Sequence, residues 1–81
     1  MDRTRREEAY LRAIGDAIRA IREDQGYSQE GLGFEAGLDR TYVSGVERGV
    51  RNPSVLSLFK LAKALNTRPG EFFVKADKRG R

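Results

Sequence analysis

Only three residues, Gly37, Leu38 and Asp39, separate two segments of this sequence that both have helical periodicity. The first segment runs from about Gln29 to Ala36 and the second from Arg40 to Arg48. Because the connection is so short, the two helices must cross steeply and pack against each other. Each helix then needs an apolar edge, and apolar residues fall at the required positions: Leu32, Ala36, Leu38, Val43 and Val46. The spacing predicts a helix-turn-helix.

Small and capping residues agree with that geometry. We expect Gly33 to lie where the two helices come closest, since a larger side chain would keep them apart. Gly37 stands where the turn needs a positive φ, which glycine adopts at little cost. Ser28 and Asp39 each precede a helical segment and can accept a hydrogen bond from its free N–H groups. Together these residues make the motif far more specific than any single residue type.

Three further helices are predicted around the motif. Apolar residues recur at steps of three and four from Ala9 to Gln25, which indicates one amphipathic helix that ends at Gly26. Ser54 caps a fourth helix, with Asn66 as its left-handed exit, and Pro69 opens a short fifth one. The fourth helix is expected to bury one face: Val55, Leu58, Phe59, Ala62 and Leu65. No strand pattern is found, so we predict an all-α fold, a compact five-helix bundle around a central helix-turn-helix.

The length of 81 residues predicts one domain spanning 1–81, with an ordered core over about 9–76. The basic arm 1–8 and the tail 77–81 are expected to be flexible. The sequence has no Cys and no His, so no thiolate metal site is expected, and we predict no metal, no cofactor and no catalytic residue. No apolar run is long enough to span a membrane. A cytoplasmic protein without a membrane partner or a small-molecule ligand is the expectation.

Charge is distributed unevenly along the chain. Residues 1–39 carry six Arg and nine acidic residues, a net charge of −3, whereas residues 40–81 carry ten Lys or Arg and three acidic residues, a net charge of +7. We therefore expect the second half to meet an anionic partner.

The run SQEGLGFEAGLDRTYVSGVERGVRNPSVLSLFKLAKAL closely resembles the Cro/C1-type (XRE-like) helix-turn-helix DNA-binding proteins. The resemblance covers about Leu11 to Phe73, and DRTYVSGVERGVRNPS is most similar to the small controller proteins of restriction-modification systems. It implies a five-helix, lambda-repressor-like domain that dimerises and inserts its third helix into the major groove.

The start of that third helix is the predicted base-reading surface, on the face opposite Val43 and Val46. An Arg suits the paired acceptors of guanine, and a Thr methyl suits thymine. The predicted base-reading residues are Arg40, Thr41, Tyr42 and Ser44. Two simpler interpretations stay open: the Tyr42 ring could be packed on the core, and Arg40 could form a solvated pair with Asp39.

Phosphate contacts are expected on both sides of the recognition helix. Gln29 lies beside free backbone N–H groups at the start of the second helix, where a phosphate can be bound. The resemblance adds the loop that follows the third helix. The predicted phosphate-contacting residues are Ser28, Gln29, Arg48, Arg51 and Asn52. Gly45, which has no side chain, is expected to let the DNA backbone come close.

Two residue pairs have predicted roles outside DNA contact. The resemblance implies a structural salt bridge between Arg22, near the end of the first helix, and Glu47. Phe72 and Phe73 are adjacent on a short helix that can bury only one face, so one ring is expected to be left for a partner. We predict a dimer interface around these two residues.

The sequence thus predicts a homodimeric, sequence-specific DNA-binding transcriptional regulator that acts on an inverted-repeat operator of double-stranded DNA and has no enzymatic activity. A restriction-modification controller is the narrower candidate. One alternative is an antitoxin-type DNA-binding regulator. The other is a small helical adaptor that uses the Phe72 face to bind protein and does not bind DNA.

Overall fold

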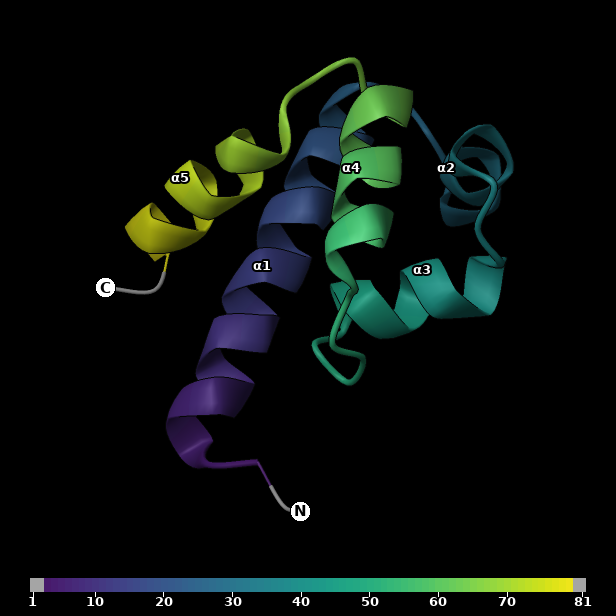
Figure 1. The fold of residues 1–81 in the computed structure, drawn as a ribbon. Helices are drawn as coiled ribbons and strands as arrows, with labels where there is room; N and C mark the ends of the chain where they lie inside the picture. The colour runs from purple at the N-terminus through teal and green to yellow at the C-terminus, as the bar shows by residue number, and fades with distance from the viewer. Residues whose placement is uncertain (1–2, 80–81) are drawn as a thin grey trace.

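A computed structural model describes residues 3–79 and, over that range, contains five helices and no strand, which confirms the predicted all-α bundle (Figure 1). The helices are α1 (Arg5–Asp24), α2 (Gln29–Ala36), α3 (Arg40–Glu47), α4 (Val55–Ala64) and α5 (Pro69–Arg79). The long α1 packs against both α5 and α3, while α2 packs against α3 and α4. None of the helices in this part of the chain has the length and apolar character needed to cross a membrane.

One core joins all five helices, and its largest fully buried side chains come from each of them: Ile18, Leu32, Val43, Val46, Leu61, Leu65 and Phe72. Close backbone contact fixes how α1 crosses α3. A Cβ built on Gly15 would lie 2.5 Å from the carbonyl oxygen of Glu47, so only glycine fits at this crossing. The helix α3, the second of the helix-turn-helix, is thereby packed directly on α1, the longest helix of the fold.

The helix-turn-helix has the predicted geometry. Gly37 has a φ of 70°, and the N–H of Leu38 donates to the carbonyl oxygen of Gly33 at 2.8 Å. A Cβ on Gly33 would lie 2.6 Å from the carbonyl oxygen of Leu38, so glycine is required here by the turn itself, whereas the nearest atoms of α3, Arg40 N and Val43 Cγ2, would lie at ordinary contact distances of 3.5 and 3.6 Å. Ser28 caps α2 and Asp39 caps α3, both as expected.

Both terminal helices are longer than predicted. Thr4 and Glu7 form a reciprocal capping box, so α1 begins at Arg5 and the part of the basic arm after Thr4 is helical rather than loose. At the other end α5 continues to Arg79, past the predicted limit at 76. Residues 1–2 and 80–81 of the expected flexible ends lie outside the described residues.

The predicted buried face of α4 is wrong at two positions. Phe59 is 57% exposed and Val55 is 68% exposed, whereas Leu58, Ala62 and Leu65 are buried as expected. Ser57 is buried instead, because its hydroxyl accepts a hydrogen bond from Tyr42 of α3 at 3.0 Å. The helix is therefore rotated so that a serine faces inward. Asn66, with a φ of 53°, is the left-handed exit that the sequence predicts.

Candidate nucleic-acid interface

The first turn of α3 is exposed and is held in place by its cap. One carboxylate oxygen of Asp39 accepts hydrogen bonds from the N–H of Thr41 at 2.8 Å and from the Thr41 hydroxyl at 2.6 Å. These two bonds, the side-chain one above all, hold the pKa of Asp39 below its usual value. Arg40 is exposed, and within the described range no ion pair joins it to Asp39. Its guanidinium is therefore available to a ligand.

Ser44 and Arg48 continue the surface that Arg40 begins. Each follows the preceding one by four residues, so all three lie on the same side of α3. Ser44 is half-buried, and Arg48, at the C-cap, is exposed. With Thr41 beside them, these residues form the outer face of the recognition helix. This arrangement brings one predicted phosphate-contacting residue, Arg48, onto the same face as the predicted base-reading residues.

Tyr42 is part of the protein's own packing. Its ring is half-buried, its hydroxyl donates to Ser57 Oγ at 3.0 Å, and it accepts from the N–H of Ser54 at 3.3 Å. Burial of the ring opposes ionisation, but the hydrogen bonds with Ser57 and Ser54 and the charge of Arg51 outweigh burial and lower the pKa of Tyr42. The structure supports the packing interpretation of Tyr42 in place of base reading. Tyr42 connects α3 to the start of α4.

The loop after α3 returns across the helix and positions Arg51. The N–H groups of Val50 and Arg51 both donate to the carbonyl oxygen of Gly45, at 3.0 and 3.2 Å. A Cβ on Gly45 would lie 2.6 Å from Arg51 Cγ, so the glycine makes room for the arginine stem and not, as predicted, for a DNA backbone. The Arg51 guanidinium lies 5.6 Å from the centre of the Tyr42 ring, a favourable cation–π distance. Arg51 and the neighbouring Asn52 are exposed.

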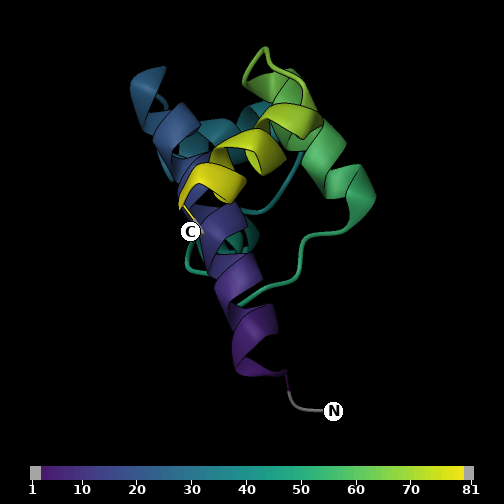
Figure 2. The same ribbon diagram turned by 90° about the vertical axis from the view of Figure 1, so that its left-hand side faces the viewer.

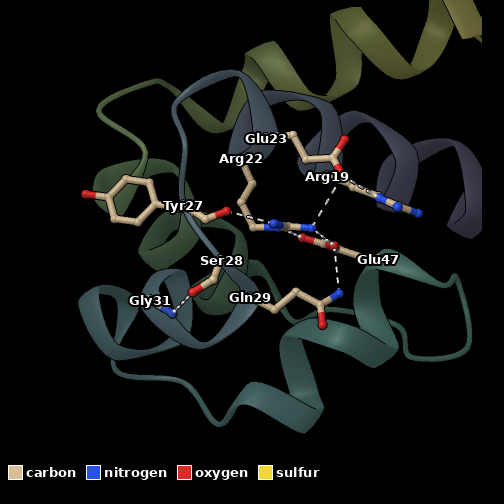
Figure 3. A network of polar contacts seen from close by, with 8 residues as sticks. All are labelled: Arg19, Arg22, Glu23, Tyr27, Ser28, Gln29, Gly31 and Glu47. Carbon is tan, nitrogen blue, oxygen red and sulfur yellow. Dashed lines mark hydrogen bonds and ion pairs between the residues drawn. The ribbon is translucent and has the colours of Figure 1, made fainter.

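At the start of α2 the Ser28 cap is as predicted, but the Gln29 side chain has a different partner from the predicted one. The Ser28 hydroxyl accepts from the N–H of Gly31 at 2.9 Å (Figure 3). Gln29 was expected to bind a phosphate with its side chain, but its amide nitrogen donates to Glu47 Oε1 at 3.0 Å. The Gln29 side chain is therefore engaged within the protein, where it connects α2 to Glu47 of α3.

A buried ion pair fixes α1, α2 and α3 relative to one another, as Figure 3 shows. Arg22 Nε donates to Glu47 Oε2 at 2.7 Å, and Arg22 Nη2 donates to Glu47 Oε1 at 3.0 Å. The remaining nitrogen, Nη1, donates to the carbonyl oxygen of Tyr27 at 2.7 Å. Arg22 is 8% exposed and Glu47 is 4% exposed, and the hydrogen bond to Glu47 raises the pKa of Arg22. The salt bridge implied by the resemblance is confirmed.

The two adjacent aromatic residues of α5 separate as predicted, one inward and one outward. Phe72 is fully buried in the core of its own chain, so the expectation that it contacts a partner is wrong. Phe73 is 49% exposed and, with Tyr10 of α1, lines a groove of about 520 Å³ between α1 and α5. Other large apolar side chains are exposed on α2 and α4, which the sequence did not indicate: Phe34, Val55, Leu56 and Phe59.

Comparison with protein families finds a match for this chain. Residues 18–72, which include α2, α3, α4 and the connecting loops, match the family model described as Helix-turn-helix.

Several similar proteins are named as control or controller proteins, and two of them are restriction-modification controller proteins. Control protein C.BamHI of Bacillus amyloliquefaciens is 46% identical over 57 residues, which cover 69% of this chain and 70% of that protein. The crystal structure of the restriction-modification controller protein C.AhdI from Aeromonas hydrophila aligns with a TM-score of 0.77 and 51% identity, over 78% of this chain and 96% of that one. The controller protein C.Esp1396I, solved as a tetramer in complex with its natural 35 base-pair operator, aligns with a TM-score of 0.79 and 37% identity, over 88% and 93% of the two chains.

Proposed function

Because this chain belongs to the helix-turn-helix family, we propose that it is a sequence-specific DNA-binding transcriptional regulator that acts as a homodimer on an inverted-repeat operator. One observation carries the proposal: Arg40, Ser44 and Arg48 share the exposed face of a short helix whose opposite face is fixed in the core. A helix presented in this way can enter the major groove of B-DNA.

The residues around α3 fall into two proposed groups, one that contacts base edges and one that contacts phosphates. Arg40 and Thr41, at the exposed first turn, suit base edges, and Ser44 follows one turn later. Arg48, Arg51 and Asn52 suit the flanking phosphates, with Ser28 at the start of α2. The stem of Arg51 packs on Gly45, and its guanidinium lies over the Tyr42 ring. Because Arg51 is already held in this way, it loses little side-chain freedom on binding a phosphate. Gln29 and Tyr42 act indirectly in this proposal, by fixing α3.

The relatives support the narrower proposal that the regulated genes belong to a restriction-modification system. C.BamHI is a control protein, and C.AhdI and C.Esp1396I are restriction-modification controller proteins. C.Esp1396I was solved with its operator, as a tetramer, which supports both DNA binding and self-association in the present chain.

We propose that the dimer forms through the exposed surface of α5 around Phe73. In a two-fold dimer the two α3 helices enter successive major grooves about 34 Å apart, so the operator half-sites lie one helical turn apart in inverted orientation. Regulation of this kind requires only that the protein occupies the operator, and no covalent bond has to be made or broken. The chain is accordingly proposed to lack enzymatic activity and to act in the cytoplasm.

Selection of binding sites from random duplexes tests the proposed function. We expect an enriched inverted repeat whose affinity for the protein falls steeply as the salt concentration rises. The adaptor alternative predicts no salt-dependent association with any duplex, and that result would reject the proposal. An antitoxin would also bind an operator, but it would in addition form a stable complex with the product of an adjacent gene.

A further inference from the structure

We propose that the beginning of α1 is part of the DNA interface, with Arg3 and Arg12 binding a backbone phosphate outside each half-site. The inference rests on the proposed function and adds residues that no part of the helix-turn-helix contains. The first observation is a direct contact: Arg3 Nη1 donates to the carbonyl oxygen of Val50 at 3.3 Å. Val50 lies in the loop that carries Arg51 and Asn52, so the start of the chain reaches the predicted phosphate-binding loop.

The second observation is backbone packing between the same two segments. Gly49 has a φ of 76°, and a Cβ built on it would lie 2.9 Å from the Cα of Arg12. The loop after α3 is therefore seated on α1 at Arg12 itself. Arg12 is exposed, so its side chain is accessible to solvent at the point where the loop contacts α1.

Figures 1 and 2 show what this packing does to the shape of the molecule. In both views the N-terminal end of α1 extends past the connection between α3 and α4. The additional turn that the Thr4 capping box gives to α1 is the part that projects. A duplex bound along α3 would meet this projection at its flank.

Charge favours a phosphate at that flank. Arg3, which contacts Val50, and Arg12, which contacts Gly49, lie with Arg48 and Arg51 around the loop as exposed arginines. These four residues are here called the flanking arginine cluster. Three acidic residues of α1 are close by in the sequence: Glu7, Glu8 and Asp16. Glu7 accepts a hydrogen bond from the N–H of Thr4 at 2.9 Å and is used in the cap, and no ion pair links Arg12 to Glu8 or to Asp16 within residues 3–79. Guanidinium groups bind phosphate oxygens through paired N–H donors, so the expected ligand is the DNA backbone.

Binding measured against salt concentration tests the cluster. Each phosphate contact contributes about 0.9 to the slope of log affinity against log salt, so R12Q, which removes two contacts per dimer, should lower the slope by about two. The electrostatic contribution to affinity vanishes at about 1 M salt. A slope smaller by about 0.9 per contact therefore corresponds, at about 0.15 M salt, to an affinity about fivefold lower per contact, or about twenty-five-fold lower per dimer. R3Q should behave in the same way. R12K, which keeps the charge, should restore most of the slope.

Arg6 provides the matched control. It lies on the same helix, is exposed, and faces the groove with Phe73 instead of the loop. R6Q removes the same charge and should leave the slope within about 0.3 of wild type, at protein concentrations where sedimentation shows both proteins to be dimers. Equal slopes for R12Q and R6Q would overturn the inference.

Phosphate ethylation interference identifies the contact itself. In the wild-type complex we expect interference at a phosphate outside each half-site, and its loss with R3Q or R12Q but not with R6Q. Interference confined to the half-sites in all four proteins would also overturn the inference. If the wild type binds no duplex at all, it is the proposed function that fails, so the two failures are distinguishable.

Discussion

The buried pair between Arg22 and Glu47 gives the sharpest test of how this fold holds its recognition helix. Replacing Arg22 with Ala removes both hydrogen bonds to the Glu47 carboxylate and the one to the carbonyl oxygen of Tyr27. The carboxylate stays behind with its side chain only 2% exposed. Its one remaining side-chain partner is the amide of Gln29. The variant therefore has an almost unpaired charge beneath the crossing of α1 and α3.

The cost follows from that geometry. Removing one partner of a buried ion pair costs about 3 to 5 kcal/mol, because the other charge remains desolvated. The Gln29 bond offsets part of this cost, and the Tyr27 carbonyl, which loses its partner, adds about 1 kcal/mol. We therefore expect Arg22→Ala to lower the free energy of unfolding by about 3 to 5 kcal/mol. For a domain of this size each kcal/mol lowers the Tm by about 4 to 8 °C, so the Tm should fall by at least about 12 °C.

Thermal and urea unfolding followed by circular dichroism measure this change. Arg19→Ala is the control, because it breaks the ion pair with Glu23, whose two side chains are 60% and 54% exposed. An exposed pair four residues apart on a helix contributes about 0.3 to 0.5 kcal/mol, so the control should barely change the Tm. A double-mutant cycle with Glu47→Ala then isolates the coupling between Arg22 and Glu47. A loss below about 1 kcal/mol in Arg22→Ala, or no coupling in the cycle, would refute the reasoning.

Three further predictions concern binding and assembly. Arg40→Ala should cost about 1 to 3 kcal/mol on the selected operator and relax the preference at one base pair per half-site; equal losses on operator and scrambled duplexes would make Arg40 a phosphate contact instead. Arg51→Ala should weaken binding to all duplexes alike and lower the salt slope by about one per protomer, as anisotropy titrations at several salt concentrations can measure. Phe73→Glu should shift the protein from dimer to monomer in sedimentation while its helical circular dichroism is unchanged, whereas a variant that stays dimeric would place the interface elsewhere.

The helix-turn-helix could be predicted because its determinants are local. Gly33, Gly37 and the two caps lie within a short window, and each constrains the backbone within a few residues of itself. The inward position of Phe72 relative to Phe73 could not be assigned in the same way. That choice depends on how α5 packs on α1, which lies about fifty residues away in the sequence.

Tyr42 and Ser57 show why the prediction of α4 was wrong. Periodicity assigns the buried face by apolar residues, so a serine counts against it. Here the serine is buried because Tyr42, on another helix, supplies a hydrogen-bond partner at 3.0 Å. The same contact engages the Tyr42 hydroxyl inside the protein, and Phe59, two residues after the buried Ser57, lies on the exposed side of α4. Both errors concern residues at or beside a contact between two helices that are separate in the sequence.

Net charge along the chain was an equally incomplete guide to the binding face. The first half has a net charge of −3 and the second half +7, so the sequence predicts that the second half meets an anionic partner. In the folded chain the arginines of the first half have different environments. Arg22 is buried with Glu47, whereas Arg3 and Arg12 lie against the loop that follows α3 in the second half. What a DNA backbone meets is the local group of charges within about one Debye length, roughly 10 Å, and not the sum over a segment. The flanking arginine cluster therefore depends on the packing of Gly49 on α1. A larger residue at position 49 should weaken DNA binding, because it would separate Arg3 and Arg12 from Arg48 and Arg51.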